Sequence, residues 1–401
     1  MRFEKTFIPY GGYWSTPFSK WQGSLSHLNA VSLAAETARG FLARRELSAE
    51  VFDSVTFGMT IPQKSSMYAG PWFAGMIGAG GVTGPWIAQA CATGARVLAS
   101  AAGDVETEGT RVGLSVTADR CSNGPHLYYP DPAGMGGTGQ KEDWVVDNFG
   151  LDPWARNSMI QTAENVAAES KITREEQDAV ALRRFEQYQD ALADGAAFHK
   201  RFMIWPMEIK DARGKRVVGT LEGDEGIFPT TAEGLAKLKP VLPDGTVTFG
   251  SQTHPADGNC GMIVSTRERA KELSRDSAIE IQVLSYGQGR AKKGFMAQAT
   301  VPAARRALDS AGIGIDDCKV IKTHNPFALN DIYFAREMGL DVGKFNNYGS
   351  SLIFGHPQGP TGTRLIIEMI EELALTGGGN GLFVGCAAGD TSAAIVVRVG
   401  G

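Results

Sequence analysis

The stretch Pro302-Ala-Ala-Arg-Arg-Ala-Leu-Asp-Ser-Ala-Gly-Ile-Gly-Ile-Asp-Asp-Cys-Lys-Val-Ile-Lys-Thr-His324 decides the fold. It begins with helix formers, turns at Gly312 and an acidic pair, and ends in a strand-like run. The stretch from Val31 to Phe57 repeats this order of helix, acidic turn and strand. Each copy is followed by a second Gly-rich turn that leads into a helix. Repetition on this scale predicts two homologous α/β halves.

A region of different composition separates the two halves. From Cys121 to about Thr248 the chain is rich in Pro, Gly, Trp and charge, and it carries one strong helix pattern. That helix starts at Thr173, which has capping-box spacing to Glu176. We expect an inserted loop domain that covers a site. The expected limits are residues 1–120 for the first half, completed by about 249–270, then 121–248 for the insertion and 271–401 for the second half.

Length and composition indicate an ordinary soluble enzyme. The chain has 401 residues, 43% hydrophobic and 21% charged, with a net charge of −5. Mixed charge of this kind gives no reason to expect a nucleic acid or an anionic membrane as partner. Five scattered cysteines do not form a disulfide framework, so a reducing, cytoplasmic setting is expected. The first residues show no secretory signal.

The stretch from Met67 to Ala102 carries a single charge, Arg96. Its Gly and Pro residues break any helix long enough to span a membrane. We therefore expect a buried strand, a turn and a helix here. So apolar a segment also predicts a subunit contact, and hence at least a homodimer.

Two cysteines and a histidine point to the chemistry. Cys91 lies in Gln89-Ala-Cys-Ala-Thr-Gly94 at the start of an Ala-rich helix pattern, where a helix N-terminus lowers a thiol pKa. His356 lies in a Gly-rich loop and can accept the thiol proton. Cys386 ends an apolar run that starts at Gly381 and forms the first strand of an expected closing hairpin. A nucleophilic thiol, a base and a second thiol together indicate acyl transfer through a thioester.

Further motifs, in this order along the chain, resemble the thiolase family over nearly the whole sequence. They are Cys91-Ala-Thr-Gly94, Met159-Ile-Gln-Thr-Ala-Glu-Asn-Val-Ala167, Thr173-Arg-Glu-Glu-Gln-Asp178, Leu235-Ala-Lys-Leu-Lys-Pro-Val-Leu242, Asn346-Asn-Tyr-Gly-Ser-Ser-Leu-Ile-Phe-Gly-His-Pro357 and Cys386-Ala-Ala-Gly389. The resemblance implies a layered α-β-α-β-α fold whose insertion binds coenzyme A. It implies thiolytic cleavage of a 3-oxoacyl-CoA to acetyl-CoA and a shortened acyl-CoA, or the reverse condensation.

The resemblance also implies a role for each site residue. Cys91 is the expected nucleophile, His356 its base and Cys386 the acid/base. The backbone N–H groups of Cys91 and Ala388 are expected to form one oxyanion hole, and His356 with a water held by His324 the other. Coenzyme A is a substrate, and no metal or bound cofactor is implied. The expected substrate and coenzyme A contacts are Met159, Leu242, Phe249, Thr253, Pro326 and Phe327.

The sequence departs from the family pattern at His324-Asn-Pro-Phe327, where thiolases commonly have Asn-Glu-Ala-Phe. Histidine beside His356 also resembles the Cys/His/His set of ketoacyl synthases. A ketoacyl-synthase-like condensing enzyme is therefore one alternative, although those enzymes lack the second cysteine. A second alternative follows from the altered coenzyme A loop, Ser251-Gln-Thr-His-Pro-Ala-Asp-Gly258. It is a non-catalytic or partner-dependent coenzyme A-binding subunit. The expected assembly is a homodimer or homotetramer.

Overall fold

The computed structural model describes residues 1–400. Its first half is a sheet with outer helices. Helix α1 (Ala30–Arg44) is capped by Asn29, whose side chain accepts hydrogen bonds from the first turn. The strands follow as β4 (Ser54–Gly58), β5 (Trp86–Ile87), β6 (Val112–Arg120) and β11 (Ala256–Ser265). Strand β4 pairs in parallel with β6, which pairs antiparallel with β11. Helices α1 and α2 (Ala69–Ile77) cover the outer face.

The second half repeats this plan. It consists of β12 (Glu280–Arg290), α9 (Thr300–Ala311), β13 (Cys318–His324), α10 (Ala328–Met338), α11 (Ser351–Phe354), α12 (Gly359–Leu375), β14 (Gly379–Ala387) and β15 (Thr391–Gly400). Strand β13 pairs in parallel with β14, and β14 forms an antiparallel hairpin with β15. The helix–turn–strand repeat and the closing hairpin expected from the sequence are therefore both present.

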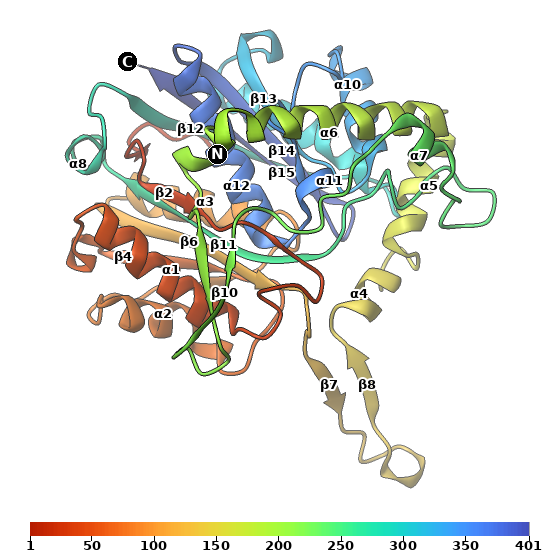
Figure 1. The fold of residues 1–401 in the computed structure, drawn as a ribbon, viewed down its shortest axis with the longest axis horizontal. Coiled ribbons are helices and arrows are strands. Elements are labelled where there is room, and N and C mark those ends of the chain that lie inside the picture. The colour runs from red at the N-terminus through yellow and green to blue at the C-terminus, as the bar shows by residue number, and fades with distance from the viewer. Residues whose placement is uncertain (401) are drawn as a thin grey trace.

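Two buried helices lie between the halves. Helix α3 (Thr93–Glu106) and helix α12 pack against each other, and each contacts strands of both halves. Both lie in the centre of the molecule (Figure 1). The short strand β1 (Phe7–Ile8) pairs with β11 and β12 and so joins the halves into one 11-stranded sheet. The order of helix, sheet, helix, sheet, helix layers matches the expected fold class.

The chain between the adjacent strands β6 and β11 forms an insertion. Its long helix α6 begins with the expected capping box of Thr173 and Glu176. The hairpin of β7 and β8 projects away from the body (Figure 1). The elements of the insertion are β7 (His126–Tyr129), β8 (Gln140–Asp143), α4 (Val146–Gly150), α5 (Met159–Glu169), α6 (Arg174–Ala196), β9 (Met207–Lys210), β10 (Val217–Leu221) and α7 (Ala232–Ala236). The limits expected for the three regions stay a prediction. The remaining short elements are β2 (Tyr13–Ser15), β3 (Ser19–Lys20) and α8 (Arg267–Leu273).

One expected element is wrong. The weakly charged stretch from Met67 to Ala102 starts with the helix α2, not with a strand, and a turn and the short strand β5 follow. Helix α2 buries Phe73 against Phe57 and ends at Gly78, whose φ of 93° stops the helix. Short apolar runs have no period that separates a strand from a helix, which explains the error. None of the helices described for residues 1–400 is both long and apolar enough to cross a bilayer.

Candidate active site

Cys91 lies in the tight loop between β5 and α3, one residue before the N-cap of the helix. Thr93 fixes this loop, because its hydroxyl accepts a hydrogen bond from the N–H of Gln89 and donates one to the carbonyl of Ala90. Gly94 then allows α3 to approach α12: a Cβ there would lie 2.6 Å from the backbone nitrogen of Thr363. The nucleophile motif of the first half is thus pressed against the helix of the second half.

His356 lies in the loop between α11 and α12. Its N–H donates to the carbonyl of His254 at 2.8 Å, and its Nδ1 lies 2.7 Å from the Thr361 hydroxyl. Just beyond, the N–H of Gly359 donates to the buried carboxylate of Asp119 on β6 at 2.9 Å. Burial raises the pKa of Asp119 to about 7, although N–H groups oppose this. These bonds fix the ring of His356 from both halves of the molecule.

His324 is the last residue of β13, beside Gly385 of the parallel strand β14. A Cβ at Gly385 would lie 2.9 Å from the Cβ of His324, so a glycine is required there. The Nδ1 of His324 lies 2.8 Å from the Ser351 hydroxyl. The ring stacks on that of His356 with centroids 4.0 Å apart and planes inclined by 30°. Both imidazoles therefore have fixed orientations.

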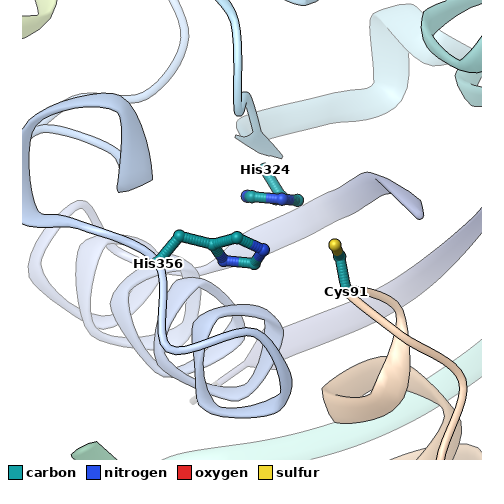
Figure 2. A group of neighbouring side chains, drawn as sticks. All are labelled: Cys91, His324 and His356. Carbon is teal, nitrogen blue, oxygen red and sulfur yellow. The ribbon is translucent and has the colours of Figure 1, made fainter. Parts of the chain in front are cut away.

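The three side chains converge on one space (Figure 2). Cys91 Sγ and one ring nitrogen of each histidine all lie within 4.8 Å of one another. The Nε2 atoms of His324 and His356 are buried and have no hydrogen-bond partner in the protein. Three such atoms could also ligate a soft metal. The arrangement suits an oxygen atom that accepts two hydrogen bonds.

Cys386 lies on β14, fully buried, and the side-chain N–H₂ of Asn330 donates to its sulfur at 3.1 Å. Burial raises its thiol pKa well above the ordinary value, and the nearby Cys91 thiol raises it further. The hydrogen bond from Asn330 acts in the opposite direction. Cys91 therefore lies near enough to Cys386 to influence its pKa, although the two cysteines come from different halves.

Burial shifts the pKa values of Cys91 and of the two histidines toward their uncharged forms. Burial raises the pKa of Cys91 to about 11, although the backbone N–H groups of Ala388 and of Cys91 itself lower it. Burial lowers the pKa of His324 to about 3. It also lowers the pKa of His356 far below its usual range, and His324 adds to this effect. Burial therefore outweighs the acidifying effect that we expected from the start of the helix.

The remaining predicted contacts lie in four places. Phe249 and Thr253 line a cavity of about 460 Å³ beside Leu352, where Phe249 is 74% exposed. The hydroxyl of Thr253 donates to the carbonyl of Ser351, and its N–H donates to the carbonyl of Pro326. Met159 lines a separate cavity next to Ala90 and Ala388. Leu242 lies in a surface groove with α5, and Phe327 packs in the core with Cys386. The structure does not bring Leu242 or Phe327 to either cavity.

Four polar residues around the site were missed at the sequence level. They are Asn330, Ser351, Thr361 and Asp119. Each acts through another group, so its sequence position carries no chemical signal of its own. Asn330 offered one hint. It lies on the apolar side of a predicted helix, and a buried amide there needs a hydrogen-bond partner.

The fold and the site agree with comparisons to known proteins. The family profile described as the N-terminal domain of thiolase matches residues 13–268, and that of the thiolase C-terminal domain matches residues 278–399. The chain belongs to the thiolase family. It is 30% identical to beta-ketothiolase BktB of Cupriavidus necator, over 96% of this chain and 97% of that protein. It is 28% identical to an acetyl-CoA acetyltransferase of Pseudomonas aeruginosa, over 95% and 96%.

Solved structures show the same likeness. The human mitochondrial 3-ketoacyl-CoA thiolase in complex with CoA superposes with a TM-score of 0.88 at 26% identity, over 98% of each chain. The acetyl-CoA acetyltransferase of Bacillus anthracis superposes with a TM-score of 0.89 at 27% identity, over 99% of each chain. The chain therefore shares the full length of these enzymes, not a single domain of them.

Proposed function

We propose that this protein is a thiolase-type acyltransferase that cleaves a 3-oxoacyl-CoA with free coenzyme A, or runs the reverse condensation. In cleavage, the Cys91 sulfur attacks the 3-oxo carbon while its proton passes to Nε2 of His356. The bond between C2 and C3 breaks, and the acetyl-CoA enolate takes a proton from Cys386. The thiol of coenzyme A then gives its proton to the Cys386 thiolate and attacks the Cys91 thioester. The released Cys91 sulfur takes back its proton from His356. The products are acetyl-CoA and the shortened acyl-CoA.

The observation that carries this proposal is the placement of two thiols and an imidazole around one space. Cys91 is close enough to the Cys386 thiol to raise the pKa of Cys386, and the side chain of Asn330 donates a hydrogen bond to the Cys386 sulfur. An acid/base beside an acyl carrier is what carbon–carbon cleavage next to a thioester requires. Coenzyme A serves as a substrate, and the cavity of Phe249 and Thr253 is the proposed route for its pantetheine arm.

Two oxyanions develop in this reaction, and both need fixed donors. The backbone N–H groups of Cys91 and Ala388 lower the pKa of the Cys91 thiol, which supports their assignment to the hole at the acyl carbon. The two unpartnered Nε2 atoms support a second hole made by His356 and His324. We propose that His324 acts there either through a water or directly.

A second candidate function is a ketoacyl-synthase-like condensation driven by decarboxylation. The stacked pair of His324 and His356 beside Cys91 favours it. In this reaction both imidazoles would donate to the thioester oxygen of a malonyl group while CO₂ leaves. Cys386 would then have no role, although the structure gives its sulfur a dedicated hydrogen-bond donor.

One experiment separates the two candidates. The purified chain is given acetoacetyl-CoA with coenzyme A, and in parallel malonyl-CoA. Thiolysis without malonyl decarboxylation supports the thiolase assignment, and peptide mapping of a briefly incubated sample should then find the acyl group on Cys91. Decarboxylation without thiolysis supports the second candidate. Acyl label on Cys386 alone would refute the assignment of the nucleophile.

We also propose a homo-oligomer. Strand β5 is the edge strand of the first half, and the apolar stretch around it leaves large side chains in solvent: Met67 at 82% exposure, Tyr68 at 64% and Trp86 at 38%. An open edge next to exposed apolar side chains is a common contact between subunits. A stable, active monomer in sedimentation would contradict this. The cytoplasm is the proposed compartment, since all five cysteines are free thiols.

A further inference from the structure

A cavity of about 390 Å³ is lined by chain neighbours of the catalytic residues, and it shares no lining residue with the Phe249–Thr253 cavity. Three of its lining residues adjoin the catalytic loops. They are Ala90, which precedes the nucleophile, Ala388, whose N–H lowers the pKa of the Cys91 thiol, and Gln358, which follows His356 by two residues. An acyl group on Cys91 can therefore extend into this space. At roughly 30 Å³ per water-sized group, the cavity has room for about a dozen heavy atoms.

The outer walls of the cavity come from the insertion and are aromatic. Trp144, Phe149 and Trp154 line it together with Met159. Polar atoms on these walls are already bonded within the protein. The indole N–H of Trp144 donates to the carbonyl of Thr60 at 3.0 Å. The carboxylate of Asp152 accepts the N–H groups of Trp154 and Ala155, both at 2.7 Å. The walls thus offer apolar contact and few free hydrogen-bonding groups.

The charged groups that line the cavity disfavour acyl groups that carry a carboxylate. Within the described part of the chain, its lining includes no lysine or arginine, whereas it includes the buried carboxylate of Asp152. A carboxylate at the far end of an acyl chain would lose its water and face this like charge. Lys293 lies close to the cavity, but it is not among the lining residues, and its Nζ lies 3.7 Å from the centre of the Trp154 ring. Acidic acyl groups are therefore disfavoured here.

We propose that this cavity selects a bulky, apolar acyl group, so that the substrate is a 3-oxoacyl-CoA with a medium-length or ring-bearing hydrocarbon remainder. This inference rests on the proposed thiolase function and adds its substrate class. The coenzyme A part then reaches Cys91 from the Phe249–Thr253 cavity, and the acyl remainder lies in this second cavity. Each added methylene that finds apolar contact in such a site changes kcat/KM by roughly tenfold.

The test compares three substrates for thiolysis by the purified full-length chain: 3-oxodecanoyl-CoA, acetoacetyl-CoA and the acidic 3-oxoadipyl-CoA. We expect kcat/KM for 3-oxodecanoyl-CoA to exceed both others by at least about tenfold. Equal or better turnover of acetoacetyl-CoA or 3-oxoadipyl-CoA overturns the substrate class and leaves the thiolase function intact. Failure with all three overturns the proposed function itself.

Two variants test whether the walls of this cavity determine the substrate selectivity. Ala88 is an exposed wall residue, so Ala88→Phe should partly fill the space. We expect the ratio of kcat/KM for 3-oxodecanoyl-CoA to that for acetoacetyl-CoA to fall about tenfold or more. Phe149→Ala removes apolar contact and should lower the same ratio. Val146→Phe is the matched control, because Val146 is 57% exposed and lies outside the cavity. An unchanged ratio in both wall variants would refute the assignment.

Discussion

The two halves share one architecture but contribute different chemistry. In the first half, a Gly-rich turn leads into α3 and places one thiol, Cys91, at the start of the helix. In the second half, the equivalent turn into α12 carries His356, and the strands β13 and β14 add His324 and Cys386. The proposed nucleophile therefore comes from one copy and the proposed acid–base groups from the other. The two halves therefore show that equivalent turns of a repeated fold can carry different residues. Because α3 and α12 meet at the centre, the turns that precede them contribute Cys91 and His356 to one site.

The sharpest way to break this comparison is to remove the acid/base of the second half. Cys386→Ala should still acylate Cys91 but should lose exchange of the α-protons of acetyl-CoA with solvent deuterium. The loss should be about 10² to 10⁴-fold, the usual contribution of a general acid or base. Mass spectrometry of acetyl-CoA incubated in D₂O measures it. Normal exchange in this variant would show that another group moves the proton.

A second prediction concerns His324, which occupies a position where thiolases commonly have asparagine. His324→Ala should lower kcat by about 10² to 10³-fold, because an oxyanion loses one support. Affinity for coenzyme A should hardly change. His324→Asn should restore part of the rate, since an amide can hold a water at the same place. If alanine leaves kcat within a few-fold of wild type, His324 is structural.

The first half can be tested through the pH dependence of its thiol. Burial raises the pKa of Cys91 to about 11, so the thiol form persists at neutral pH. At pH 8 the thiolate fraction should be roughly 10² lower than that of an ordinary thiol with a pKa of about 8.5. Alkylation of Cys91 by iodoacetamide should therefore rise about tenfold per pH unit from pH 7 to 10. A fast reaction that is already level at pH 7 would instead reveal a preformed thiolate–imidazolium pair.

The smallest expected effect sharpens the role of the second thiol. Asn330→Leu keeps a similar volume but removes the donor to Cys386. A hydrogen bond to a charged group contributes about 1.5–3 kcal/mol, so the thiol pKa should rise by about one unit or more. Exchange of α-protons at pH 8 should fall about tenfold, and its pH profile should move upward. Acylation of Cys91 serves as the internal control and should not shift with pH in the same way.

The sequence anticipated most of the fold where a local signal was strong. The repeated helix–turn–strand units, the capping box at Thr173 and the closing hairpin each depend on contacts within a few residues, and all three are present. The helix α2 was missed because its Gly-rich apolar run has no clear period. The two sheet layers were expected, but their link through the short strand β1 into one hydrogen-bonded sheet was not foreseen.

By itself the sequence determined the residue types at the centre: a thiol before a helix, a histidine in a Gly-rich loop and a second thiol at a strand end. Their order along the chain was enough to indicate the family. Only the tertiary structure decided their relative placement and ionisation. The stacking of His324 on His356, the raised pKa of Cys91 and the bond from Asn330 to Cys386 each depend on how separate elements of the chain pack together. Burial and orientation arise between segments far apart in the chain, and no local pattern encodes them.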